Sequence, residues 1–199
     1  MQTRSEERMK LLKSRKALST VVTTLIILVV SVLLATVVTF YAINVTTTRV
    51  QEEALFLTKP HLWVKNSSYY LGAIMIINTG GRDVVLDKIA VRGQTVSWGD
   101  VFYCVTRGGI SEDLPFIDNI AAEKDIGIKD PQTPNKNLTL KQGVADMDLT
   151  LKSGYTIIVY MKNPDSLSMN DIGLTVGITV FTSNAQYYKE ANVEAVAES

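Results

Sequence analysis

The chain has 199 residues, 46% of them hydrophobic, and its 20 basic and 20 acidic residues give a formal net charge of zero. This length accommodates one membrane or filament helix and one globular domain of roughly 130–140 residues. The charges are unevenly placed, because residues 1–17 carry six basic groups against Glu6 and Glu7 and the remainder is mildly acidic. An acidic body gives no electrostatic basis for nucleic-acid binding, so we expect no nucleic-acid partner.

The chain contains few histidine and cysteine residues, which often serve as catalytic groups. It has one cysteine, Cys104, and one histidine, His61, so it forms no intramolecular disulfide and lacks the partners that a zinc site needs. Cys104 lies in an apolar run and is expected to be a buried small hydrophobe. No glycine-rich phosphate loop, dinucleotide fingerprint or serine-nucleophile motif occurs in the sequence. We therefore expect no enzymatic activity, no cofactor and no metal.

The N-terminal region reads as a basic leader, residues 1–17, followed by an apolar helix. Lys16 is the last charged residue before Arg49. Leu18 to Val45 spans about 42 Å as a helix, more than the roughly 30 Å hydrocarbon core of a bilayer. This run is also longer than an ordinary secretory signal, and the basic leader predicts a cytoplasmic N-terminus.

The helix is predicted to continue beyond the apolar run. The first proline is Pro60 and the first glycine is Gly72, so no helix breaker occurs before residue 60. Ile43, Val50, Ala54 and Leu57 recur at helical spacing, which predicts an amphipathic extension. We place the helix at 18–58 and a β-rich domain at 59–199.

After Pro60, short β-rich runs alternate with turn residues, which predicts an antiparallel β-sandwich of immunoglobulin-like type and an overall α+β class. Residues 71–77 and 84–91, separated by Asn78-Thr79-Gly80-Gly81, are predicted to form a hairpin. The other expected strands are 96–105, 138–140, 149–151, 156–161, 172–182 and 187–193.

A long irregular loop is expected at about 108–137. It contains three prolines and six acidic residues: Glu112, Asp113, Asp118, Glu123, Asp125 and Asp130. The acidic residues follow no calcium-binding pattern, so a solvated loop is expected. As a long loop it remains a candidate recognition surface.

The junction between leader and helix resembles the class III signal peptide of archaeal type IV pilins and archaellins. In that family two charged residues and a small residue precede the cleavage site and a hydrophobic helix follows it. Arg15, Lys16 and Ala17, followed by Leu18 and an apolar run, have this layout. The resemblance covers residues 13–57 closely and the β-rich remainder only in general character.

The resemblance implies cleavage between Ala17 and Leu18 by a prepilin peptidase. It also implies an assembly ATPase with its membrane platform, membrane lipid as the environment before assembly, and other copies of the subunit as partners. The precursor would lie in the cell membrane and the mature subunit in an extracellular filament used for adhesion. Val22 replaces the glutamate usual in bacterial pilins, and the glycines common at the start of archaellin helices are absent. An adhesion pilus is thus favoured over a motility filament.

Small residues follow one face of the predicted helix and would let helices approach closely. The stripe recurs at steps of three and four residues, and all its members but Leu28 are small or hydroxylated: Thr20, Thr24, Leu28, Ser31, Ala35, Thr39, Ala42 and Thr46. This stripe predicts helix-to-helix packing.

Three Asn-x-Ser/Thr sequons occur, at Asn44, Asn66 and Asn137. Asn66 and Asn137 fall in predicted loops or strand edges, where a glycan would lie at the surface of an exported glycoprotein. Asn44 lies on the helix.

Other functions remain open at this point. A signal-anchor without cleavage would give a membrane-anchored extracellular β-sandwich that binds a ligand through the 108–137 loop and never polymerises. A minor pilin that primes or caps a filament combines the two hypotheses.

Overall fold

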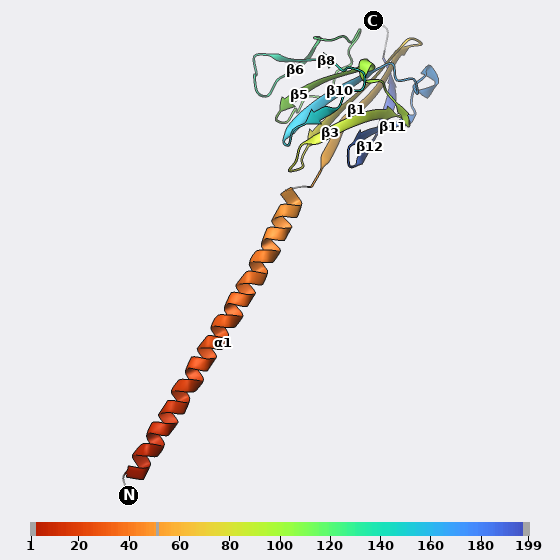
Figure 1. Cartoon of the computed structure of the whole chain (residues 1–199). Helices are drawn as coiled ribbons and strands as arrows, with labels where there is room; N and C mark the ends of the chain where they lie inside the picture. The colour runs from red at the N-terminus through yellow and green to blue at the C-terminus, as the bar shows by residue number, and fades with distance from the viewer. Residues whose placement is uncertain (1–2, 51, 197–199) are drawn as a thin grey trace. The chain divides into compact units, whose positions relative to one another are not determined.

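The computed structural model describes the backbone of residues 3–50 and 52–196 and the side chains of residues 19–47 and 52–196. The chain divides into two compact units, residues 1–49 and 50–199 (Figure 1). The first is the helix α1 (Thr3–Val50), and the second is a β unit. An N-terminal apolar helix followed by a mostly antiparallel, curled sheet confirms the α+β class.

The β unit contains twelve strands and two short 3-10 helices among its described residues. The strands are β1 (Leu55–Asn66), β2 (Tyr69–Asn78), β3 (Val84–Val91), β4 (Gln94–Thr95), β5 (Val101–Arg107), β6 (Asp125–Lys129), β7 (Asn137–Thr139), β8 (Lys141–Gln142), β9 (Leu149–Leu151), β10 (Tyr155–Lys162), β11 (Thr175–Thr182) and β12 (Gln186–Ala195). The 3-10 helices are Trp98–Asp100 and Met169–Asp171.

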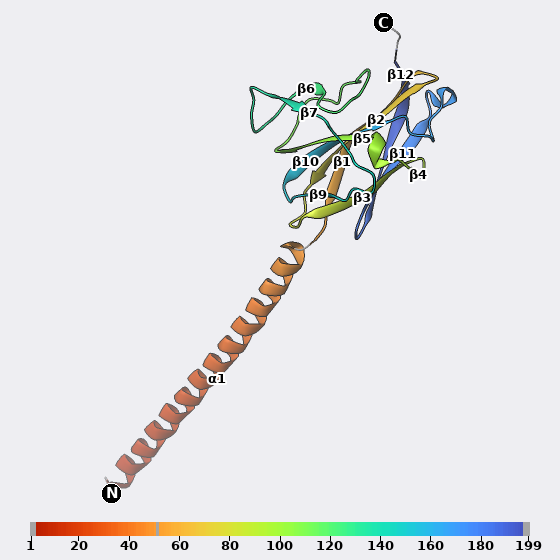
Figure 2. The same ribbon diagram turned by 45° about the horizontal axis from the view of Figure 1, so that its top comes forward.

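Ten strands form one curled sheet in the order β4-β3-β11-β12-β1-β2-β10-β5-β8, with β9 paired to β3 (Figure 2). Every pairing is antiparallel except that of β1 with β12, where Leu62 lies opposite Val193. This parallel pairing joins the two halves of the sheet, β4-β3-β11-β12 and β1-β2-β10-β5-β8.

The two halves share a main hydrophobic core. Leu62 and Ile157 from one half and Leu86 and Ile178 from the other are fully buried in it. Each strand contributes alternate residues, since successive side chains point to opposite faces. Along β11, for example, Val176, Ile178 and Val180 are buried while their neighbours are not.

A second core lies on the other face of the β1-β2-β10-β5 half. Its cover is the segment 108–140, which we call the strap. Apolar strap residues pack on the sheet side chains Trp63, Leu71, Phe102 and Tyr160; they are Ile110, Leu114, Ile117, Ile120, Ile126, Ile128, Leu138 and Leu140. The strap also contains the two-stranded sheet β6-β7.

Three expectations from the sequence are wrong. The helix ends at Val50 rather than near Leu57, because Leu55 and Leu57 are alternate buried residues at the start of β1. Pro60 therefore lies inside a strand, where Lys59 has φ 49° and the pairing with β2 shifts between Thr58 and His61. Such an irregularity accommodates a residue without an amide hydrogen.

The second wrong expectation is the hairpin of residues 71–77 and 84–91. β2 and β3 follow one another in sequence but do not pair, since β2 lies between β1 and β10, and β3 contacts β11, β4 and β9. The third concerns the 108–137 loop, which is neither wholly irregular nor polar throughout, because it contains β6 and buries a row of isoleucines.

Candidate functional site

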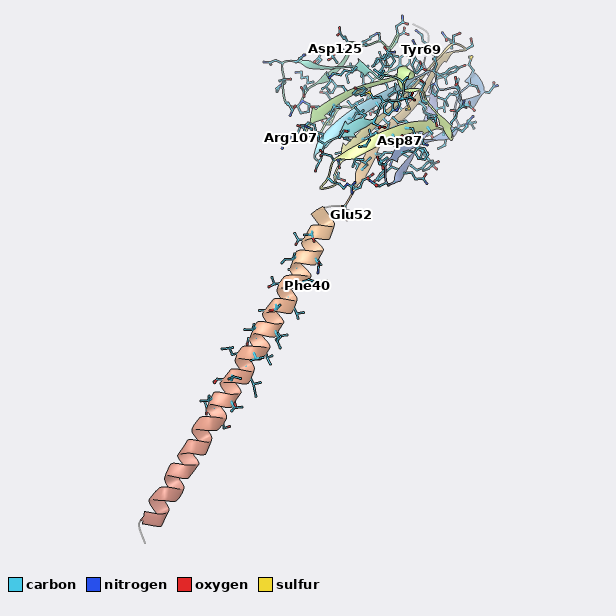
Figure 3. All side chains as sticks on the ribbon, in the orientation of Figure 1. Phe40, Glu52, Tyr69, Asp87, Arg107 and Asp125 are labelled. Atoms are coloured by element: carbon cyan, nitrogen blue, oxygen red, sulfur yellow. The ribbon has the colours of Figure 1, made fainter. Side chains whose placement is uncertain are left out.

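The helix is the most unusual surface of the chain. Ser19–Thr47 is long and apolar enough to cross a membrane, which suits a membrane anchor or a signal sequence. Its large apolar side chains are exposed within the helical unit, from 42% at Val45 to 70% at Tyr41. Figure 3 shows these side chains, Phe40 among them, projecting on all sides of the helix.

Six hydroxyl groups of this segment donate to backbone carbonyls of the same helix. The hydroxyl of Ser31 donates to the carbonyl of Ile27 at 2.6 Å, and that of Thr36 to Val32 at 2.8 Å. Thr23, Thr24, Thr46 and Thr47 make equivalent bonds three or four residues back. A hydroxyl bonded in this way can enter an apolar environment without losing a partner.

The predicted stripe of small residues lies on this exposed helix. Thr20, Thr24, Ser31, Ala35, Thr39 and Ala42 are all exposed. Around Ala35 and Thr39, a shallow groove of about 470 Å³ is also lined by Val32, Thr36, Phe40 and Ile43. Small side chains flanked by larger ones make a hollow into which a side chain of another helix can fit.

The predicted processing residues Arg15, Lys16, Ala17 and Leu18 belong to α1. Their side chains lie outside the described part of the chain, so cleavage stays a prediction.

The strap is fixed to the sheet by polar contacts as well as by its core. Along the side of β1 that faces the strap, Lys59 donates to the carbonyl of Ile110 at 2.9 Å, His61 contacts Asp113 at 3.0 Å, and Lys65 pairs with Asp118 at 2.6 Å. These contacts lower the pKa of both Asp113 and Asp118.

Two tyrosines, the buried Tyr160 and the half-buried Tyr69, complete the attachment of the strap. Tyr160 donates to the carbonyl of Pro115 at 3.0 Å, and Tyr69 donates to Ile117 at 2.8 Å while accepting from the amide of Ile120. Burial raises the pKa of both tyrosines. The strap is therefore an ordered layer packed on the sheet, and this packing argues against its being a free loop that recognises a ligand.

The segment that leads into β1 is held by two turns of the β unit. We call this arrangement the Glu53 latch. The Glu53 carboxylate accepts from Thr182 and Asn184, and its backbone carbonyl accepts from Tyr187. The next carbonyl, that of Ala54, accepts from the amides of Thr79 at 2.9 Å and Gly80 at 3.0 Å.

The two sequons of the β unit differ in their geometry. Asn66 ends β1 at a hairpin, and its side-chain oxygen accepts from the amide of Ser68 at 3.0 Å. Asn137 begins β7 and donates its side-chain amide to Asp125 at 2.8 Å. A glycan is attached through that amide nitrogen, so Asn66 is the more accessible acceptor.

The single histidine is engaged by its neighbours and the single cysteine is buried. His61 stacks on Trp63 at 4.9 Å and contacts Asp113, and burial raises the pKa of Cys104 to about 12. Within the described residues, no cluster of histidine, cysteine and carboxylate side chains could hold a metal.

A hollow of about 440 Å³ in the β unit lies beside Asp87, Trp98 and residues 145–148. Its lining includes Asp87, Asp146 and Asp148, but among the described residues no buried polar side-chain atom lacks a partner, so we assign it no ligand.

Comparison with known proteins gives no family assignment. No family model and no curated protein matches the chain. Among solved structures, a copper-bound PCuAC domain from PmoF2 is 14% identical with a TM-score of 0.32, over 73% of this chain and all of that one. A family 123 glycoside hydrolase from Clostridium perfringens is 9% identical with a TM-score of 0.33, over 73% of this chain and 27% of its own.

A third structure, the β-glucosidase EmGH1 from Erythrobacter marinus, is 11% identical with a TM-score of 0.27, over 71% of this chain and 15% of its own. The match thus spans only a small part of either hydrolase. At these TM-scores the likenesses carry no argument about fold or function.

Proposed function

We propose that this chain is the structural subunit of an archaeal type IV pilus-like surface filament that serves in adhesion. The observation that carries the proposal is the uncharged helix segment Ser19–Thr47, whose side chains are exposed around its whole circumference. The class III-like junction at Arg15, Lys16, Ala17 and Leu18 adds a means of releasing it from its leader.

The energetics require a partner for the helix. Burying a large apolar side chain is worth about 1.5–3 kcal/mol. The described part of the helix exposes seventeen such side chains, which would cost about 25–50 kcal/mol in water, several times the stability of a whole domain. The segment must therefore reside in lipid or against other apolar helices.

Packing rather than hydrophobic transfer would drive assembly, because lipid tails are as apolar as the helix. The groove around Ala35 and Thr39 supplies a contact in which two backbones approach closely. In this proposal the basic leader keeps the N-terminus in the cytoplasm and a prepilin peptidase removes residues 1–17. The assembly ATPase and its platform then move the helix from lipid into the filament core.

In the same proposal the β unit is an immunoglobulin-like sandwich that coats the filament outside the cell. The shared core between the two halves of the sheet supports this reading.

The direct test is mass spectrometry of the N-terminal peptide, from material sheared off cells and from membranes in parallel. A peptide that begins at Leu18 in the sheared fraction supports processing and assembly together. Lys16→Ala and Ala17→Phe should both block maturation; normal processing of both variants contradicts the proposed cleavage site.

A second test separates assembly from membrane insertion. Ala35→Leu fills the groove and should leave a processed, membrane-inserted subunit that yields few filaments. Val37→Leu adds bulk outside the groove and serves as the matched control. Equal filament yields from both variants would contradict packing at the groove.

The alternative is a single-span membrane anchor that carries an extracellular binding module and does not polymerise. The fixed strap weakens this alternative, because its ligand-binding loop would be the 108–137 segment. An intact N-terminus found only in membranes would favour the anchor.

A further inference from the structure

The outer face of the β11-β12 pair carries an exposed aromatic side chain that no core explains. Tyr188 is 61% exposed and lies opposite Thr179 in the pairing of the two strands. On the same face of β12 follow Glu190 and Asn192, opposite Gly177 and Thr175. We call these six residues the Tyr188 strip.

The tyrosine ring is held in place although it is exposed. Its hydroxyl donates to the Glu190 carboxylate at 3.1 Å. The outer part of the ring lies over Gly177, where an added Cβ would stand 2.3 Å from a ring carbon and 2.6 Å from the hydroxyl oxygen. The ring can lie down on the sheet only because residue 177 has no side chain.

A glycine in the interior of a strand weakens the strand. Glycine in a strand interior loses packing and often marks a place where a ligand or another backbone approaches closely. Elsewhere on this face Phe181 is only partly exposed and lies beneath the Lys88 ammonium at 5.0 Å. Tyr188 is the ring of this face that remains open to solvent.

The polar groups beside the ring are oriented by contacts within the strip. Thr175 donates to the side-chain oxygen of Asn192 at 2.8 Å, which leaves the Asn192 amide group as a donor directed away from Thr175. Glu190 uses one carboxylate oxygen for Tyr188 and keeps the other as an acceptor. With side chains about 6.8 Å apart along β12, ring, acceptor and donor form a row on a flat surface.

This chemistry selects a neutral, polyhydroxylated ligand. The carboxylate disfavours phosphate and nucleic acid, and both strands are already paired, so an extended peptide cannot add to the sheet here. A sugar ring presents C–H groups that suit the negative face of an aromatic ring. Its hydroxyls can donate to Glu190 and accept from Asn192.

We propose that the Tyr188 strip is a binding surface for neutral carbohydrate, with Tyr188 as the stacking platform and Glu190 and Asn192 as hydrogen-bonding partners. The proposal does not depend on filament formation, since the strip belongs wholly to the β unit. A chain that polymerises and one that stays anchored would both present it.

The test uses the full-length protein in a detergent without a sugar headgroup. The protein is first applied to an array of neutral glucan, mannan, galactan and N-acetylglucosamine oligomers, and the best oligomer is then titrated by calorimetry. Tyr188→Ala should weaken binding about tenfold or more, the scale of a lost aromatic stack. Tyr188→Phe should stay within about threefold, because the stacking face remains.

Two further variants test whether binding depends on the position of the Tyr188 ring. Gly177→Ala should weaken binding as strongly as Tyr188→Ala, because the methyl group lifts the ring. Lys189→Ala changes a residue of the same strand on its opposite face and should bind like the wild type. Circular dichroism of each variant checks that the fold is retained.

Three results would overturn the proposal. The first is that no neutral oligomer on the array binds the wild type. The second is that Tyr188→Ala and Gly177→Ala both bind with wild-type affinity. The third is that Tyr188→Ala leaves carbohydrate binding intact and changes the sedimentation of the protein, which would identify the strip as a contact between copies of this chain.

Discussion

Replacing Gly80 with alanine should break the Glu53 latch and destabilise the β unit. A Cβ at residue 80 would lie 2.6 Å from the carbonyl oxygen of Glu52 and 2.7 Å from the amide nitrogen of Ala54. Both are backbone atoms of the segment leading into β1, so neither can turn aside as a flexible side chain would. The segment has to move away from the turn.

The cost follows from the contacts that the movement disturbs. Overpacking of this kind costs about 1–3 kcal/mol. The two hydrogen bonds from Thr79 and Gly80 to the Ala54 carbonyl are each worth about 0.5–1.5 kcal/mol. We expect the free energy of unfolding to fall by about 2–4 kcal/mol, since the disturbance is partial.

Urea unfolding followed by tryptophan fluorescence measures this change, because both tryptophans, Trp63 and Trp98, lie in the β unit. With a slope of about 2 kcal/mol per molar urea, the midpoint should fall by about 1–2 M. Gly99→Ala is the matched control, since its Cβ would meet only the Ser97 hydroxyl at 3.7 Å. Equal midpoints for the two variants would refute the reasoning.

Three other predictions concern the β unit. The folded pKa values of Asp113 and Asp118 lie below their unfolded values, so their stabilisation of the strap is present above about pH 4 and is lost as the pH falls through the folded values. Amide protection factors over residues 110–120 should therefore fall as the pH is lowered through this range, and unchanged protection there would contradict the prediction. In an exported chain, glycopeptide mass spectrometry should find higher glycan occupancy at Asn66 than at Asn137, because Asn137 gives its amide to Asp125; the reverse order would contradict this. Cys104 should resist a thiol reagent in the native protein and react on unfolding, because burial raises its pKa to about 12.

The sequence predicted those parts of the fold that depend on local pattern. The uncharged run and the lack of any glycine or proline identified the helix, and alternation of apolar residues located β11. β1 was missed because Val50, Ala54 and Leu57 fit helical spacing while Leu55 and Leu57 fit strand spacing, and Pro60 suggested an end rather than a bulge. Short apolar runs leave this ambiguity unresolved.

The pairing of strands that are distant in the chain could not be predicted from the sequence. The turn after Asn78 has the composition of a hairpin, but its amides bond to Ala54 and its chain crosses to the other half of the sheet. The strap also contains apolar residues that pack on the sheet, such as Ile110, Leu114 and Ile117. The prolines and acidic residues around them favoured a solvated loop, so their burial was not predicted. The Tyr188 strip could not be predicted, because it depends on the register of β11 against β12 and the sequence of one strand does not determine that register.

The pairing of β1 with β12 bears on how this protein is made. The first and last described strands of the β unit lie side by side, with Leu62 opposite Val193, so the sheet cannot close until β12 has been synthesised. Contacts so distant in sequence slow folding, because a long stretch of chain must be ordered before they form. A chain truncated before β12 would keep its apolar helix but expose the edges of β1 and β11. Such a truncated chain would therefore be prone to aggregation, and only copies that include β12 would reach the folded state.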